Sequence, residues 1–337
     1  MSKITLLGIE TSCDDTSIAL VQDGVVLANL ITSQWIHKKY GGVVPEVASR
    51  LHVEAIIGMY DMCLELAGIS QDEITAVAVT RGPGLMGSLL VGMSFAKGLS
   101  LSLDIPLIEV NHLQAHALSL FIEHKPVYPL LCLTVSGGHT QILLIKGDFE
   151  IELIGQTLDD AAGEAFDKSG KLLGLDYPAG PLIDQLAQSG KPVYAFPEPR
   201  VSDFNFSFSG LKTSFLYFLK ERLAVNPNFI EEEKFNLCCS VQHAIVNILI
   251  NKLHTAALHY QIQSIGVAGG VSANSELRSA IQSMCSKNHW NLYLPKISYC
   301  TDNAAMIAHV GYSKYLKSEF VDLSVNALAR YPITQTL

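Results

Sequence analysis

Charged side chains are scarce in this chain of 337 residues, at 16% against roughly 25% in an ordinary soluble domain. Hydrophobic residues reach 49%. A surface with so little charge is commonly covered by another chain, so we expect a partner or an oligomer. The net charge of -9 argues against a protein that binds nucleic acid over its whole surface, because phosphates are neutralised by clustered Lys and Arg. Any contact with RNA is therefore local or shared.

Paired cysteines and long apolar runs are also missing. The seven Cys are odd in number and scattered, and no C-x-x-C spacing occurs, which argues against a disulfide framework and a cysteine zinc site. No stretch of about 18 consecutive apolar residues occurs, and the first apolar run is stopped by Glu10, too early for a signal peptide. We expect a cytoplasmic protein that does not enter a membrane.

The order of predicted elements occurs twice along the chain, which predicts a duplicated α/β fold. The first copy has strands at 4–9, 17–22 and 25–31, a helix over 44–68, a strand at 76–80, a helix over 85–101 and a strand at 105–110. The second copy has strands at 130–135, 141–146, 150–154 and 265–268, and a closing helix. We expect two domains, residues 1–125 and 126–337, around a central cleft. The second domain carries a helical and hairpin insertion at about 156–260, and its last helix is able to pack back on the first domain.

Each copy places a polar loop directly after its first strand, Glu10–Thr16 in one and Ser136–Thr140 in the other. Loops of this kind bind phosphate through backbone N–H groups, and glycine leaves no Cβ in the way. We expect both loops to face the cleft. A glycine turn at Ala268–Asn274 suits the close approach of a nucleoside, with the amide of Asn274 near it, and a helix cap is equally favoured.

His112 and His116 are candidate metal ligands, because a spacing of four residues puts both imidazoles on one helical face. Asn111 is the expected N-cap of that helix, which follows a strand, where open α/β folds bind ligands. Asp302 is the candidate third ligand, reaching across the cleft from the second repeat, and an ordinary helix N-cap is the alternative. Two His and one Asp suit Fe²⁺ or Zn²⁺ and leave coordination positions open to a substrate.

The sequence argues against three other chemistries. Leu113 occupies the position of the glutamate in the H-E-x-x-H motif of metalloproteases, so peptidase chemistry lacks its general base. The segment Gly82–Gly87 has the form G-x-G-x-x-G, but Pro83 removes an N–H donor and the acid at Asp104 precedes the next strand. We expect these glycines to serve a tight turn and close helix packing. No P-loop sequence occurs.

The predicted insertion carries aromatic residues at alternating positions, Phe204, Phe206 and Phe208. A period of two is typical of one face of a strand, so we expect these rings on the buried face of a strand. A platform on which nucleic-acid bases stack is the alternative.

Together these motifs resemble those of the TsaD threonylcarbamoyltransferases, once called glycoproteases, within the actin and sugar-kinase-like superfamily. The resemblance covers essentially the whole chain, and its motifs are very specific in combination. The stretches that carry it are 8–15 (GIETSCDD), 40–50 (YGGVVPEVASR), 82–85, 111–116, 135–141 (VSGGHTQ), 159–168 (DDAAGEAFDK), 173–178, 206–212 (FSFSGLK), 268–274 and 300–303. The resemblance implies two duplicated actin-like, ribonuclease-H-like α/β domains.

The resemblance also implies a reaction. In that family the threonylcarbamoyl group of threonylcarbamoyl-AMP passes to the exocyclic amine of adenosine 37, in tRNAs that read codons beginning with A. It implies a metal, usually Fe²⁺, bound by His112, His116 and Asp302, and as functional partners the TsaB paralogue, the TsaE ATPase and TsaC. It implies that the adenylate is held by Val135, Ser136, Gly137, Gly138, His139, Asp167, Gly180, Asp184 and Asn274.

Two other functions compete on the same duplicated fold. An ATP-dependent kinase or O-carbamoyltransferase would show a base for an acceptor hydroxyl, and nothing marks one. A non-catalytic paralogue would have lost the metal pair, whereas both His112 and His116 are present. The tRNA-modifying transferase is therefore preferred. Because the net charge is -9 and a face is expected to be covered, we expect the chain alone to modify tRNA poorly.

Overall fold

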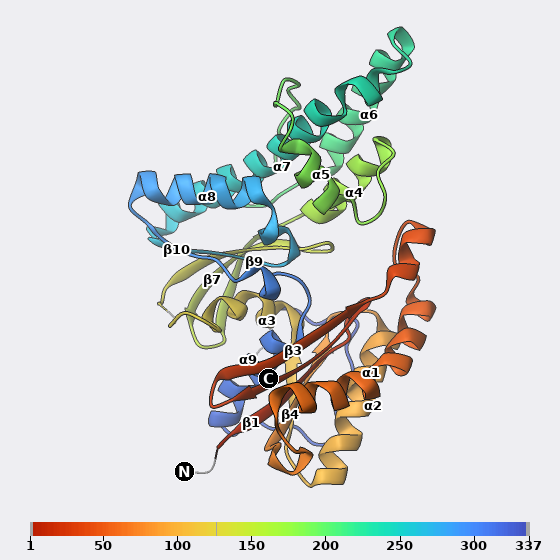
Figure 1. The fold of residues 1–337 in the computed structure, drawn as a ribbon. Helices are drawn as coiled ribbons and strands as arrows, with labels where there is room; N and C mark the ends of the chain where they lie inside the picture. Colours follow the sequence, from red (N-terminus) through yellow and green to blue (C-terminus); the bar gives the residue numbers. More distant parts are fainter. Residues whose placement is uncertain (1–2, 126, 335–337) are drawn as a thin grey trace. The chain divides into compact units, whose positions relative to one another are not determined.

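The computed structural model describes residues 3–125 and 127–334, apart from the side chain of Lys38. The chain forms two compact units (Figure 1). Unit 1 consists of residues 1–125 and 301–337, and unit 2 consists of residues 126–300. The second unit thus ends at Cys300, whereas the sequence suggested a domain that continues to the C-terminus. The reason is the last helix, α9 (Ala304–Leu316), whose buried residues pack on the sheet of unit 1.

Unit 1 is built on a sheet with the strand order β3-β2-β1-β4-β5. Its first three strands form an antiparallel meander, and β4 and β5 run parallel to β1. Asp23 and Gly24 join β2 to β3 with φ values of 50° and 81°, as a tight hairpin turn requires. The strands are β1 (Thr5–Glu10), β2 (Asp15–Gln22), β3 (Val25–Ser33), β4 (Ala76–Gly82) and β5 (Leu107–Asn111).

Helices cover both faces of this sheet. Leu7 and Ile9 on β1 pack in one core with residues of α1 and α2, whereas Gly8 between them lies against α9. Alternate residues of a strand point to opposite faces, so α9 lies on the face opposite α1 and α2. The helical segments are η1 (Trp35–Tyr40), α1 (Pro45–Ala67), η2 (Gln71–Glu73), α2 (Met86–Leu103), α3 (His112–Leu118), η3 (Ser119–Phe121) and α9.

One helix among the described residues, α2, has the length and apolar composition of a membrane span. It connects β4 to β5, which are neighbouring parallel strands of one sheet. A helix in that position is a crossover that packs back on the sheet, and α2 contacts β4 and α1. It is therefore a crossover helix of the α/β fold.

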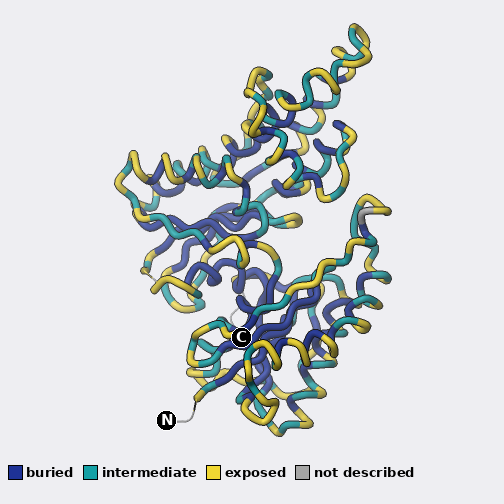
Figure 2. The backbone as a smooth tube through the Cα atoms, in the orientation of Figure 1, coloured by how far each residue is buried: buried dark blue, intermediate teal, exposed yellow. Residues whose placement is uncertain are grey.

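Unit 2 repeats the topology of unit 1. Its sheet has the order β10-β9-β6-β7-β8, with β6, β7 and β8 antiparallel and β9 and β10 parallel to β6. The central strands of both sheets are buried (Figure 2). The strands are β6 (Leu130–Val135), β7 (Thr140–Gly147), β8 (Glu150–Gln156), β9 (Ser264–Ala268) and β10 (Asn291–Tyr293).

The predicted insertion lies between β8 and β9. Its described residues form helices, and the hairpin expected there is not formed. It contains α4 (Ala162–Leu172), α5 (Ala179–Ala187), α6 (Ser209–Val225) and the long α7 (Phe229–Tyr260). The remaining segments of unit 2 are η4 (Gly270–Ala273), α8 (Ser275–Asn288) and η5 (Ile297–Tyr299).

The strand expected at Phe204–Phe208 is not formed. Phe206 makes only an isolated bridge to Thr157, although Phe206 and Phe208 are fully buried. The carboxylate of Asp159 accepts the N–H of Phe208 at 2.7 Å, which turns the chain into α6 before a ladder can form. Burial of the two rings also excludes them as a platform for bases.

We expect Gly8→Ala to destabilise the protein by roughly 1–3 kcal/mol, the usual cost of overpacking. An added Cβ would lie 2.4 Å from the carbonyl oxygen of Ala304 on α9. The matched control is Gly58→Ala on the exposed side of α1, where nothing lies within 4 Å of the new Cβ and helix propensity gains up to about 1 kcal/mol. Denaturant unfolding measures the free energy of unfolding of both variants. If Gly8→Ala were as stable as Gly58→Ala, the close packing of Gly8 against α9 would be contradicted.

Candidate active site

The two candidate histidines lie on α3, which begins directly after β5. Asn111 is the N-cap, as predicted: its Oδ1 accepts the N–H groups of Leu113 at 2.9 Å and Gln114 at 3.2 Å. His112 and His116 are both buried, and their rings meet edge to face with centroids 4.6 Å apart. The cap and the four-residue spacing thus direct both imidazoles to the same place.

Asp302 faces this pair of imidazoles. Its Oδ1 lies 2.9 Å from Nε2 of His116 and 3.5 Å from Nε2 of His112, and the three candidate ligand atoms all lie within 4.8 Å of one another. All three residues belong to unit 1, so the expectation that Asp302 reaches across from the second domain is wrong. The helix-cap alternative also does not hold, because the N-cap of α9 is Asn303, which accepts the N–H of Met306.

The start of α9 is attached to the N-terminal meander, which explains why Asp302 belongs to unit 1. The N–H of Ala304 donates to Ser17 Oγ on β2 at 2.8 Å, and the N–H of Ala305 donates to Asn29 Oδ1 on β3 at 3.2 Å. Two side chains of the first sheet therefore bond the first turn of a helix almost 300 residues later in the chain.

A buried carboxylate that the sequence reasoning missed orients His112. Glu10, at the end of β1, has no exposed surface, and its Oε2 lies 2.8 Å from Nδ1 of His112. Thr80 donates to the same oxygen at 2.7 Å, and the N–H of Ser12 donates to Oε1 at 2.5 Å. A carboxylate on Nδ1 directs Nε2 to a metal in many metal sites. The available signal was an acid at the end of an otherwise apolar strand.

The charged groups of this site shift one another's pKa values. Burial alone lowers the pKa of His112, but the carboxylates of Glu10 and Asp302 outweigh it and raise that pKa to about 9. Burial raises the pKa of Glu10, and the His112 charge outweighs this and lowers it. Burial, aided by the carboxylates of Asp302 and Asp14, raises the pKa of Asp15 to about 7. Without a metal, His112 and Glu10 therefore form an ion pair.

The donor set fits a divalent metal ion. Two imidazole nitrogens and one carboxylate oxygen converge, a combination that suits Fe²⁺ or Zn²⁺. His116 Nδ1 is buried and has no hydrogen-bond partner among the described residues, so its Nε2 is the atom held toward Asp302. A cation among these carboxylates would also offset their mutual repulsion.

In unit 2 a tight loop follows β6, as the sequence predicted. The N–H of Ser136 donates to the carbonyl of His139 at 2.8 Å, and the N–H of His139 donates back to Ser136 Oγ at 3.2 Å. Gly137 and Gly138 are exposed, and a Cβ on either would meet nothing within 4 Å. These glycines therefore do not relieve a clash inside the protein, and without a Cβ they let a ligand approach the main chain closely.

The second glycine turn of unit 2 lies against the first. A Cβ on Gly269, whose φ is 90°, would lie 2.5 Å from the carbonyl of Val135, so glycine brings the ends of β6 and β9 together. Asn274 follows and caps α8, accepting the N–H of Leu277 at 2.9 Å and donating to Gln242 at 2.7 Å. We expected the amide of Asn274 near a nucleoside, but its oxygen and its nitrogen both have hydrogen-bond partners within the protein.

The remaining predicted residues of unit 2 lie on α4 and α5. Asp167 accepts the N–H of Ala179 at 2.7 Å and so holds the start of α5, next to Gly180. Asp184 accepts both the N–H and the hydroxyl of Ser275, the latter at 2.7 Å, at the start of α8. All nine residues predicted for the adenylate therefore belong to unit 2, and all three predicted metal ligands belong to unit 1.

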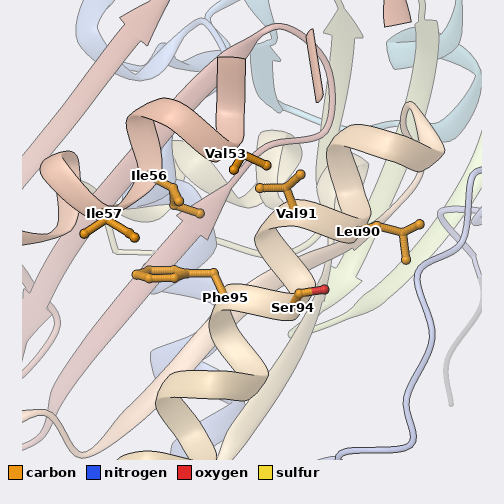
Figure 3. A pocket seen from close by; sticks show the side chains of 7 residues that line it. All are labelled: Val53, Ile56, Ile57, Leu90, Val91, Ser94 and Phe95. Atoms are coloured by element: carbon orange, nitrogen blue, oxygen red, sulfur yellow. The ribbon is translucent and has the colours of Figure 1, made fainter. Parts of the chain in front are cut away.

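An apolar groove lies on unit 1 between α1 and α2, with a volume of about 430 Å³ (Figure 3). Val53 and Ile57 on α1 and Leu90 on α2 are each about half exposed or more. The exposed residues of α2 between Met86 and Leu101 include no charged side chain. Solvated helix faces are normally charged or polar, so this one has the character of a contact surface. The lining residues are Val53, Ile56, Ile57, Leu90, Val91, Ser94 and Phe95.

Comparison with solved structures defines the class of fold. HypF of T. kodakarensis matches with a TM-score of 0.61 at 12% identity, over 96% of this chain and 49% of that chain. Component A of the (R)-2-hydroxyglutaryl-CoA dehydratase of Acidaminococcus fermentans matches with a TM-score of 0.55 at 14% identity, over 93% and 99% of the two chains. The chain thus has the duplicated actin-like α/β fold that the sequence indicated.

Sequence relatives define the family. The family model for tRNA N6-adenosine threonylcarbamoyltransferase, TsaD, matches residues 25–309. The enzyme of that name from Riemerella anatipestifer is 54% identical over 99% of both chains, and that from Porphyromonas gingivalis is 51% identical over 98% of this chain and 99% of its own. The chain belongs to the TsaD family of tRNA N6-adenosine threonylcarbamoyltransferases. It is a transferase that places a threonylcarbamoyl group on tRNA, not a kinase or a non-catalytic paralogue.

In the metal-free protein we expect His112 to titrate near pH 9, and Glu10→Gln to lower its pKa by removing an opposite charge. The folded pKa lies above the unfolded value of about 6.5. Protonated His112 therefore stabilises the folded protein. This contribution to the free energy of unfolding is complete below about pH 6.5 and is lost as the pH rises through about 9.

An NMR titration of the imidazole protons measures the pKa of His112 in the wild-type protein and in Glu10→Gln. His309 on α9 is the internal control, since burial lowers its pKa to about 4 and it should titrate alike in both. An unchanged pKa of His112 in Glu10→Gln would contradict the assigned ion pair.

Proposed function

We propose that this transferase takes the threonylcarbamoyl group from threonylcarbamoyl-AMP and attaches it to N6 of adenosine 37, in tRNAs that read codons beginning with A. The reaction takes place in the cytoplasm. The observation that supports this most is the convergence of His112, His116 and Asp302 within 4.8 Å, in a chain of the TsaD family. A TsaD chain that had lost its activity would not be expected to keep such a set.

We propose that these three residues bind Fe²⁺, with Zn²⁺ as the alternative ion. When bound, the metal would supply Lewis-acid polarisation of the threonylcarbamoyl group. Glu10 keeps Nδ1 of His112 occupied, so Nε2 remains the ligand atom. Asp302 supplies an anionic oxygen, and because its side chain is 25% exposed the centre is not sealed from solvent.

The residues of unit 2 are proposed to hold the adenylate. The backbone of Gly137 and Gly138 suits its phosphate, because exposed glycines let an anion approach the main chain. The carboxylates of Asp167 and Asp184 would repel a phosphate and suit hydroxyl groups instead. N6 of adenosine then bonds to the carbamoyl carbon, the bond from that carbon to the phosphate oxygen breaks, and AMP leaves as the amine loses a proton.

We expect Asp302→Ala to lose most of its bound iron and to abolish transfer while the protein stays folded, because three ligands leave no redundancy. The matched control is Asp322→Ala, which removes an exposed carboxylate of the same unit. Bound iron is measured by elemental analysis after anaerobic loading, and threonylcarbamoyladenosine by mass spectrometry of digested tRNA. Full iron content and activity in Asp302→Ala would refute the three-ligand site.

We propose that TsaB covers the apolar groove between α1 and α2, and that TsaE and TsaC act with the complex. A paralogous subunit would present a comparable pair of helices. Gly87, Ser94 and Gly98 on the exposed side of α2 are small enough for close helix contact. Burial of the exposed Val53, Ile57 and Leu90 would provide the hydrophobic driving force.

We expect Ile57→Lys to prevent binding of TsaB and to reduce tRNA modification by the assembly to the low level of the isolated chain. The side chain is 61% exposed, so its replacement should leave the melting temperature nearly unchanged. Leu258→Lys on α7, at 56% exposure, is the matched control in unit 2. Calorimetric titration with TsaB measures binding, and wild-type affinity in Ile57→Lys would rule out this surface.

A further inference from the structure

Three carbonyl groups of the C-terminal segment face the helix that carries both histidines. Asn111 Nδ2 donates to the carbonyls of Tyr331 at 3.3 Å and Pro332 at 3.1 Å. Gln114 Nε2 donates to the carbonyl of Ile333 at 2.7 Å. Asn111 and Gln114 are 1% and 5% exposed, so water does not replace these partners. More than 200 residues of sequence separate the two sides of each contact.

Asn111 uses the two ends of its amide for two different tasks. Its Oδ1 accepts the first N–H groups of α3, and its Nδ2 donates to the C-terminal segment. The nitrogen of an amide only donates and its oxygen only accepts. The carbonyls of the C-terminal segment accept from Nδ2 of Asn111. They therefore hold the amide in the orientation in which its oxygen caps α3.

The C-terminal segment is itself anchored at several points. The N–H of Leu328 donates to the carbonyl of Arg81 at 2.8 Å, and Arg81 Nε donates to the carbonyl of Asn326 at 3.0 Å. The Tyr331 hydroxyl donates to the buried carboxylate of Glu109 on β5, 3.1 Å away. The guanidinium of Arg81 also lies over the Tyr331 ring, 5.4 Å from its centroid. The segment therefore cannot slide along α3.

The helix α3 needs external support, because it has only seven residues and short helices are marginal by themselves. We propose that residues 326–333 position α3, and that Asn111 and Gln114 are positioning residues for the metal ligands His112 and His116. This inference rests on the proposed metal site. It extends that site to a chain segment that contributes no ligand of its own.

Asn111→Asp and Gln114→Met test the inference. Aspartate keeps the cap oxygen, but it places a second acceptor against the carbonyls of Tyr331 and Pro332. Methionine removes the donor to Ile333 at similar volume and without charge. We expect each variant to raise the Kd for Zn²⁺ by about 10- to 100-fold, as loss of outer contacts does in other sites. The negative charge of Asn111→Asp would by itself strengthen cation binding, so weaker binding reports geometry.

Zn²⁺ affinity is measured by competition with a chromophoric chelator, together with the melting temperature of each metal-free protein. A chain ending at Thr334 keeps every contact named above, whereas a chain ending at Arg330 removes the three carbonyls and should bind Zn²⁺ as weakly as the side-chain variants. Wild-type Kd in both side-chain variants, even with lowered melting temperatures, would overturn this inference alone. A full chain without affinity for Zn²⁺ or Fe²⁺ would overturn the metal site as well.

Discussion

The 2.8 Å contact between Glu10 and His112 is the interaction on which the candidate centre of unit 1 depends. It joins the end of β1 to the start of α3, 102 residues apart in sequence. The parallel pairing of β1 with β4 and of β4 with β5 makes it possible, because the carboxyl ends of parallel strands lie at one edge of the sheet. The carboxylate of Glu10 has no exposed surface. It remains charged because the His112 imidazolium and the donors Thr80 and Ser12 compensate its charge.

The two units use the same topology for different chemistry. After its first strand, unit 1 carries several acids: Glu10 contacts His112, and the charges of Asp302 and Asp14 help to raise the pKa of Asp15. Such a concentration of carboxylates favours a cation. After the equivalent strand β6, unit 2 has exposed glycines without an acidic side chain, and a main chain of this kind favours an anion. Side chains on equivalent loops, and not the fold itself, therefore separate the proposed metal-binding half from the proposed adenylate-binding half.

Local sequence patterns predicted much of this arrangement. The predictions that failed did so for one reason, which is contact between residues far apart in the sequence. The strand at 130–135 was predicted with its observed bounds, and the cap at Asn111 and the shared face of His112 and His116 were also correct. The strand expected around Phe206 was wrong, because Asp159 turns the chain from 49 residues away. Asp302 was assigned to the wrong domain, because Ser17 and Asn29 hold the start of α9 on the first sheet.

The sequence by itself determined the duplicated α/β order, the turn at Asp23 and Gly24, and the candidate ligand set, since these depend on periodicity and on residues a few positions apart. Only the tertiary structure decided that the three ligands share one unit, that Glu10 holds His112, and that carbonyls of residues 331–333 bond to the helix of both histidines. Those contacts join residues 102 to 221 positions apart. No local period encodes such pairs, because residues so far apart in sequence meet only through tertiary packing.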